Sequence, residues 1–176
     1  MRCLIMLNNF LPDQQVNSIY DITPESLKEK GIKGIITDLD NTLVEWDRPS
    51  ATPPLINWFQ QMEYNQIKVT IVSNNNEARV KFLADPLLTP YIYKARKPMT
   101  KAFNRAVKDM GLEKHETVVI GDQLLTDVLG GNRSGFHTIL VVPVAKTDGV
   151  VTKFNRMVER RILNWFKKKG KLTWED

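Results

Sequence analysis

The sequence predicts an α/β fold: a doubly wound, mostly parallel sheet of five strands with helices on both faces. Three observations support this prediction. From residue 32 onward, short apolar runs alternate with longer segments of helical periodicity, as in parallel βαβ units. The short runs are nearly continuous in valine and isoleucine, which is typical of strands buried on both faces. The chain has 176 residues and is 42% hydrophobic, enough for one domain with its own core.

Each predicted strand is a brief apolar run bounded by polar residues or glycine. The five strands are residues 32–37, 68–72, 91–94, 117–120 and 138–142, and 91–94 is the weakest. Four helices are predicted between them, at residues 53–64, 77–83, 100–110 and 124–133. Pro86 ends the second helix, since the residue before a proline disfavours helical backbone. Gly111 ends the third, and glycines interrupt the fourth.

The two ends of the chain depart from this alternation. Residues 1–31 are predicted to be an irregular N-terminal extension with one short helix, which Thr23 caps, Pro24 begins and Gly31 ends. Residues 151–176 are predicted to form a basic amphipathic C-terminal helix. We therefore expect a single domain over residues 1–176, with these two segments at its ends.

The charge and the cysteine content narrow the class of protein. The net charge is +5 at pH 7, and the segment from residue 151 holds eight basic residues against three acidic ones, which accounts for all of the excess. One cysteine excludes an internal disulfide. The longest early apolar run is too short to cross a bilayer or to form the core of a signal peptide. These features favour a cytoplasmic protein.

Polar side chains follow four of the predicted strands at the point where each ends. They are Asp38, Asp40, Asn41 and Thr42 after the first strand, Ser73, Asn74 and Asn75 after the second, Arg96 and Lys97 after the third, and Asp122 and Asp127 after the fourth. Ligands of doubly wound sheets bind beyond the carboxyl ends of the strands. Any one of these residues alone would fit a turn or a solvated surface, but the series predicts a site.

The residue types at these ends suit phosphate chemistry with a divalent cation. Crowded carboxylates repel one another unless a cation intervenes, so Asp38, Asp40 and Asp122 predict a Mg²⁺ site. A cation there would draw an anionic phosphate toward a carboxylate. Ser73, the backbone N–H groups near Asn74, and a cationic side chain would bind phosphate oxygens. Arg96 is an alternative to Lys97 as that cation, and we favour Lys97 because Pro98 follows it.

Four motifs in this order resemble those of the haloacid dehalogenase-like (HAD) superfamily: DLDNTLV, VSNN, a Lys-Pro pair and GDQLLTD. The matching span covers residues 32–142. The opening residues and the short connections resemble the subfamily IIIA branch of YqeG type, which is also similar to mitochondrial phosphatidylglycerophosphate phosphatases. The resemblance implies a HAD-like Rossmannoid fold and phosphatase activity. The second aspartate followed by Asn41 and Thr42 follows the phosphatase form rather than that of dehalogenases or mutases.

The resemblance also implies a role for each matched residue. Asp38 corresponds to the nucleophile that becomes an aspartyl-phosphate, and Asp40 to the acid and base. The metal ligands become Asp38, Asp122 and the backbone carbonyl of Asp40. Ser73 and Lys97 match the hydroxyl and the cation that bind the phosphate, and Asp127 matches the second acid of the fourth motif, which orients Lys97 or a metal-bound water. Beside these matches, Asn74 is predicted to bind the phosphate and Thr42 to be a supporting residue. The two histidines, His115 and His137, lie far from the motifs and are not expected at the site.

The spacing of the motifs leaves no room for a cap domain. Only 32 residues separate Asp40 from Ser73, and 23 separate Ser73 from Lys97, most of them used by a helix or a strand. The site should therefore be open, which suits a phosphoprotein, a polynucleotide end or a lipid headgroup. No nucleic-acid-binding motif is present, so a nucleic acid is the least expected of these. The oligomeric state is left open.

The C-terminal helix bears on the substrate. Its apolar stripe comprises Phe154, Met157, Val158, Ile162, Trp165 and Phe166, surrounded by basic residues. Such a helix either rests on an anionic membrane or packs on the sheet, and both remain open. The sequence thus predicts a Mg²⁺-dependent phosphatase for phosphatidylglycerophosphate or a similar anionic phospholipid, peripheral on the inner face of the membrane. The alternatives are a phosphatase for a soluble metabolite, nucleotide or phosphoprotein, and a non-catalytic phosphate- or nucleic-acid-binding module.

Overall fold

A computed structural model describes residues 8–145, 150–168 and 170. Its centre is a parallel six-stranded sheet in the order β1-β6-β5-β2-β3-β4. The strands are β1 (Gln14–Val16), β2 (Gly34–Thr37), β3 (Lys68–Val72), β4 (Tyr91–Ile92), β5 (Thr117–Gly121) and β6 (His137–Val141). The order reverses on either side of β2, so the carboxyl ends of β2, β3 and β5 meet at the topological switch point. The predicted doubly wound fold is confirmed, and the residues that the structure describes include no cap domain.

The prediction of five strands is wrong by one, because the N-terminal extension supplies β1. This strand pairs in parallel with β6 at the edge of the sheet. Its three residues are half-buried and mostly polar, so it lacks the apolar run by which the buried strands were found. Instead, the Asp13 carboxylate accepts a hydrogen bond from the backbone N–H of Thr138, at 2.8 Å, and anchors the strand.

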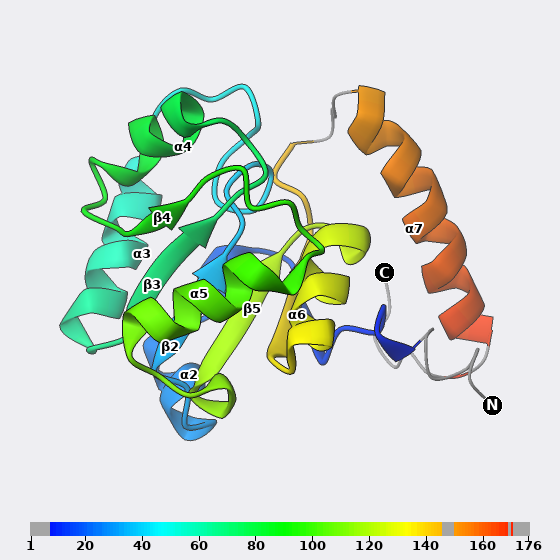
Figure 1. Cartoon of the computed structure of the whole chain (residues 1–176), viewed down its shortest axis with the longest axis horizontal. Helices are drawn as coiled ribbons and strands as arrows, with labels where there is room; N and C mark the ends of the chain where they lie inside the picture. The colour runs from blue at the N-terminus through cyan, green and yellow to red at the C-terminus, as the bar shows by residue number, and fades with distance from the viewer. Residues whose placement is uncertain (1–7, 146–149, 169, 171–176) are drawn as a thin grey trace.

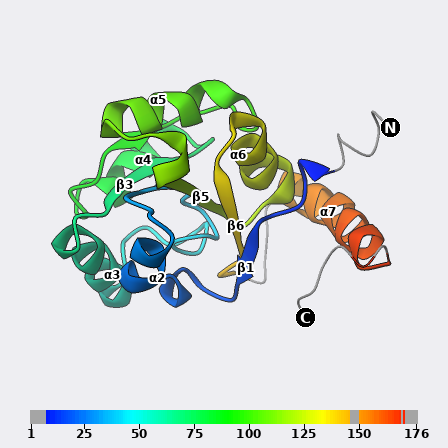
Figure 2. The same ribbon diagram turned by 90° about the horizontal axis from the view of Figure 1, so that it is seen from below.

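Helices cover both faces of the sheet (Figures 1 and 2). One face packs on α2 (Pro24–Glu29), α3 (Pro53–Tyr64) and α4 (Glu77–Ala84), and the other on α5 (Thr100–Met110). Adjacent residues of β2 divide between the two cores, with Ile35 in the larger and Ile36 in the smaller. Short 3₁₀ turns, η1 (Ile19–Asp21) and η2 (Lys114–Glu116), complete the connections.

The helix predicted over residues 124–133 is two elements. A single π-helical turn, η3 (Leu124–Val128), precedes α6 (Leu129–Ser134). The backbone N–H groups of Asp127 and Val128 both donate to the carbonyl of Gln123, so the turn is wider than an α-helical one. Such π turns are frequent at functional sites, and this one carries Asp127.

The C-terminal helix α7 (Val150–Lys168) lies beyond α6 and packs on η3 (Figure 2). Ile162 and Leu163 contact a small core of Leu124, Val128 and Leu140, and Phe166 is fully buried. This part of the predicted apolar stripe therefore packs on the fold. The side chains of Lys153, Phe154 and Arg156, and residues 1–7, Lys169 and 171–176 of the terminal segments, lie outside the described residues. No described helix is long and apolar enough to span a membrane.

Candidate active site

The end of β2 begins the site. Asp38 follows the strand directly and is held in line by its backbone N–H, which donates to the carbonyl of Ile120 on β5. The chain then turns through Asn41, whose φ of 63° lies in the left-handed region that asparagine tolerates. This turn leaves Asp38 buried and brings the Asp40 carboxylate to the rim, where its side chain is 21% exposed.

A buried lysine joins the first and the last motif. Lys97 Nζ lies 2.8 Å from Asp38 Oδ1 and 2.7 Å from Asp127 Oδ1. Burial alone would lower the pKa of Lys97, but Asp127 and Asp38 raise it above its ordinary value, so the lysine is charged. Burial raises the pKa of Asp127 to about 6, against the effect of Lys97, and Asp38 adds to the rise. Of the two predicted cations, Lys97 is the one inside this cluster.

Asn74 places this lysine. Its amide oxygen accepts the backbone N–H of Lys97 at 2.7 Å, and its amide nitrogen donates to the Lys97 carbonyl at 3.2 Å. The Asn74 side chain is therefore committed to Lys97, and phosphate binding by Asn74, as predicted, would fall to its backbone N–H. The Ser73 hydroxyl oxygen accepts from the backbone N–H of Asn75, which leaves its proton free to donate.

A third carboxylate comes from the end of β5. Asp122 is almost fully buried, and its Oδ1 accepts a hydrogen bond from the equally buried Thr42 hydroxyl at 3.0 Å. Asp38, Asp122 and Asp127 each offer an oxygen, and these three atoms lie within 4.8 Å of one another. A side chain at Gly121 would place a Cβ 2.2 Å from Asp127, so only glycine lets the two acids of this motif approach.

The Asp40 carboxylate has partners that the sequence reasoning missed. Arg79, on α4, donates to Asp40 Oδ1 from Nε at 3.0 Å and from Nη2 at 2.9 Å. The amide nitrogen of Asn75 donates to Asp40 Oδ2 at 3.0 Å. Burial raises the pKa of Asp40, and both partners oppose that rise. A basic residue in the first turn of the helix after VSNN was the available signal.

The structure thus brings together all eight predicted site residues from four separate segments. The two histidines, which were not expected at the site, lie elsewhere in the fold. His115 belongs to η2, and His137 begins β6, at the opposite edge of the sheet from the acids.

A comparison with curated proteins decides the family. The chain is 70% identical to the probable phosphatase YqeG of Bacillus subtilis over 95% of its own length and 97% of that protein. The chain belongs to the HAD-like phosphatases. A family model described as HAD-hydrolase-like matches residues 94–148, and one described as mitochondrial PGP phosphatase matches residues 1–84.

More distant relatives of this HAD-like phosphatase agree with its fold. The chain is 26% identical over 90% of its length to phosphatidylglycerophosphate phosphatase 1 of Arabidopsis thaliana, of which it spans 49%. Among solved structures, the cobalt-bound deoxy-D-mannose-octulosonate 8-phosphate phosphatase of Haemophilus influenzae aligns with a TM-score of 0.56. That alignment covers 78% of this chain and 90% of the other at 17% identity, and it supports the fold alone.

Proposed function

We propose that the chain is a Mg²⁺-dependent phosphomonoester hydrolase that works through an aspartyl-phosphate on Asp38. One observation carries this proposal: Lys97 Nζ bridges Asp38 and Asp127, and an oxygen of Asp122 lies within 4.8 Å of an oxygen of each of these two acids. This buried cluster then contains a carboxylate nucleophile, a cation that can bind phosphate oxygens, and acids that can bind a metal. Structural ion pairs alone would not require the third acid.

The donor set fits magnesium. Two buried carboxylates from different strands, Asp38 and Asp122, offer hard oxygen ligands, and the backbone carbonyl of Asp40 would supply a third. Water and a substrate oxygen suit the remaining positions. When bound, the ion would offset the repulsion between Asp38 and an incoming phosphate.

The reaction then consists of two phosphoryl transfers, first to Asp38 and then to water, and the side chains have a role in each. In the first, an Asp38 oxygen bonds to phosphorus, the ester bond breaks, and Asp40 gives its proton to the leaving oxygen. In the second, Asp40 takes a proton from water, whose oxygen attacks phosphorus while the bond to Asp38 breaks. Lys97 and Ser73 hold the non-bridging oxygens throughout. The raised pKa of Asp40 supports its use as an acid.

The chemistry is tested with 4-nitrophenyl phosphate. The purified chain should release phosphate with Mg²⁺ and stop when a chelator removes the ion, and Asp38→Asn should reduce release to background. Asp109→Asn, which changes an exposed aspartate on α5, is the matched control and should retain activity. Undiminished turnover in Asp38→Asn would end the proposal and favour a non-catalytic phosphate-binding module.

We propose phosphatidylglycerophosphate or a similar anionic phospholipid as the substrate, met at the inner face of the membrane by a cytoplasmic protein. The similarity to the Arabidopsis phosphatase and the match to the PGP phosphatase model support this. So does the outer surface of α7, where Arg160, Arg161 and Lys168 are exposed. The packing of Phe166 leaves these charges facing solvent while the helix stays on the fold.

Vesicles test this substrate. Changing Arg160, Arg161 and Lys168 to glutamine removes about 1 kcal/mol of attraction for each charge, so binding to anionic vesicles should fall about 10²-fold. Glutamine at Lys81, Lys101 and Lys108, exposed lysines on other helices, is the control and should leave binding unchanged. Equal turnover of the lipid and of soluble phosphate esters would remove the lipid and favour a soluble metabolite, nucleotide or phosphoprotein.

A further inference from the structure

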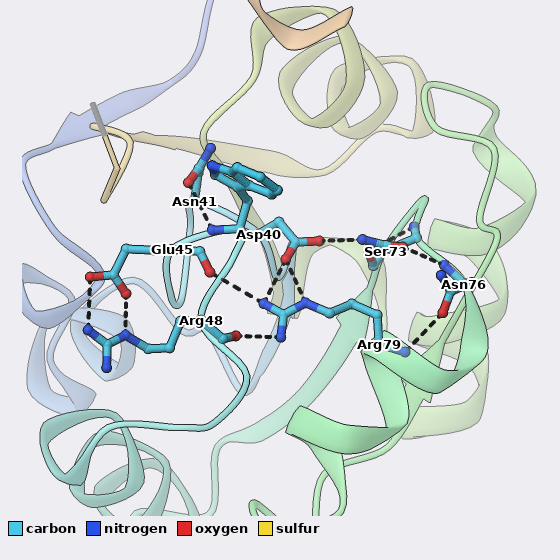
Figure 3. A network of polar contacts seen from close by, with 9 residues as sticks. Asp40, Asn41, Glu45, Arg48, Ser73, Asn76 and Arg79 are labelled. Carbon is cyan, nitrogen blue, oxygen red and sulfur yellow. Dashed lines mark hydrogen bonds and ion pairs between the residues drawn. The ribbon is translucent and has the colours of Figure 1, made fainter. Parts of the chain in front are cut away.

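We propose that Arg79 is a positioning residue for the reaction, which fixes the Asp40 carboxylate where it can protonate the leaving group. This inference rests on the proposed function, since it takes Asp40 to be the acid. Arg79 is the third residue of α4, and the side chain of the N-cap residue Asn76 accepts its backbone N–H at 3.0 Å. The helix start therefore defines the point from which the arginine reaches across to the loop after β2 (Figure 3).

The guanidinium is held by groups other than Asp40. Its Nη1 donates to the carbonyl of Arg48 at 2.6 Å, and Nη2 donates to the carbonyl of Glu45 at 3.3 Å. These backbone contacts set the plane of the guanidinium, and its Nε and Nη2 then meet one oxygen of Asp40. A planar fork fixed in this way imposes an orientation on its carboxylate partner, which a flexible ammonium would not do.

The second oxygen of Asp40 is fixed from the same segment. Asn75 donates to Asp40 Oδ2, and its own amide oxygen accepts the backbone N–H of Asn76 at 2.8 Å. Asn75 also gives its backbone N–H to the Ser73 hydroxyl. Residues 73–79 therefore hold both oxygens of the acid and present the predicted phosphate-binding hydroxyl. This common origin aligns the proton donor with the phosphate.

Asp40 needs such support more than Asp38 does. The Asp40 side chain is 21% exposed at the rim, whereas that of Asp38 is 9% exposed and enclosed by the cluster. An aspartate at a rim has several rotamers open to it, and only one directs the carboxyl toward the ester oxygen. Without Arg79, we expect the carboxyl to leave that orientation for most of the time.

A purely structural role for Arg79 makes a different prediction. If it only joined α4 to the loop at residues 45–48, its loss would reduce the turnover of every substrate alike. If it places the acid, the reduction in turnover that follows its loss should depend on the leaving group. An alkoxide needs a proton as it departs, whereas 4-nitrophenolate leaves without one.

The experiment compares glycerol phosphate with 4-nitrophenyl phosphate in Arg79→Gln. We expect kcat/KM to fall about 10²-fold for the alkyl ester and less than about tenfold for the aryl ester. Arg79→Lys should recover part of the loss on the alkyl ester. Arg48→Gln is the matched control, because the Arg48 side chain pairs with Glu45 and does not reach Asp40. This variant should leave kcat/KM unchanged for both esters.

A double-mutant cycle guards against a general loss of structure. In an Asp40→Asn background, Arg79→Gln should cause no further loss on glycerol phosphate, since the group that it positions is gone. Equal losses on both esters, or additive losses in the cycle, would overturn the inference while leaving an active phosphatase. An unsubstituted chain that hydrolyses neither ester would instead overturn the proposed function, and the inference with it.

Discussion

The central strands β2 and β5 are flanked by charged residues at both ends, and these residues differ in burial between the carboxyl and the amino ends. Asp38 and Asp122 follow the strands and are buried, and the side chains of Asp38 and Lys97 are 9% and 2% exposed. Lys33 and Glu116 precede the same strands and form an ion pair in which the lysine is 63% exposed. Among the described residues at the ends of these two strands, charges are therefore buried at the carboxyl edge and left partly in water at the amino edge.

The comparison separates function from stability. A surface ion pair contributes about 0–1 kcal/mol, whereas the cost of removing charges from water can exceed the attraction between buried partners. The pKa of about 6 for Asp127 reflects this cost, because burial raises the pKa by more than Lys97 at 2.7 Å lowers it. Stability alone therefore does not favour the cluster of Asp38, Lys97 and Asp127. A site that binds an anion and a cation does require such buried charges.

The largest effect should come from exchanging lysine for methionine at the two edges. Lys97→Met leaves Asp38 and Asp127 without their buried partner, so we expect the free energy of unfolding without metal to fall by about 3–5 kcal/mol. Activity should fall by about 10²–10³-fold. Lys33→Met should cost less than about 1 kcal/mol and leave activity unchanged.

Denaturant unfolding measures the free energy of unfolding of both variants, and phosphate release measures their activity. Equal stability losses at Lys97 and Lys33 would show that the two edges do not differ as described.

A smaller effect should follow from replacing two threonines that act at opposite ends of β5. Thr42, from the loop after β2, bonds Asp122 beyond the carboxyl end of the strand, and Thr117 begins the strand. Thr42→Val keeps the shape of a fully buried side chain but removes the donor to Asp122 Oδ1. The loss should cost about 1–3 kcal/mol. It should also raise the Mg²⁺ concentration needed for half-maximal activity about tenfold or more, because Asp122 loses its orientation.

Thr117→Val is the matched control. Its hydroxyl donates to the carbonyl of Glu113 at the amino end of the same strand. It should lower stability without changing the Mg²⁺ dependence, and a shift in both variants would contradict the assignment of Asp122 to the metal.

The smallest effect concerns His137 at the amino edge. Its Nε2 is buried without a hydrogen-bond partner among the described residues, and burial lowers the pKa of His137 below its ordinary 6.5, against the effect of Asp13. Between that lowered pKa and 6.5, the unfolded chain binds the proton more readily. Stability should therefore be lost as the pH falls through this window.

His137→Gln should remove this contribution. The loss of Tm between about pH 7.5 and about pH 5.5 should be smaller in the variant by less than about 2 °C, because the imidazole is 36% exposed. A larger loss of Tm in the variant would mean that the sign is wrong.

The sequence was a good guide wherever burial or backbone geometry leaves a local trace. The buried strands β2, β3 and β5 were evident from their apolar runs, and the order of polar endings located the acids, Ser73 and Lys97. β1 could not be found in this way, because an edge strand needs only its hydrogen bonds to β6. The π turn η3 was also hidden, since glycines near residue 130 indicate a broken helix but not its geometry.

Arg79 was missed for a different reason. Its role depends on two backbone carbonyls and one carboxylate more than 30 residues away in the chain. A basic residue in the first turn after VSNN marks Arg79 as a candidate, but no local pattern identifies the partners that it reaches. The commitment of the Asn74 side chain to Lys97 is a contact of the same kind, across 23 positions.

The stereochemical course at phosphorus tests the nucleophilic role of Asp38 most directly. The measurement is the hydrolysis of a phosphate monoester made chiral with oxygen isotopes, in isotopically labelled water with Mg²⁺. Attack by Asp38 followed by attack of water inverts phosphorus twice, so the account predicts overall retention of configuration. Inversion would mean that water attacks the ester in one step, and it would contradict the aspartyl-phosphate.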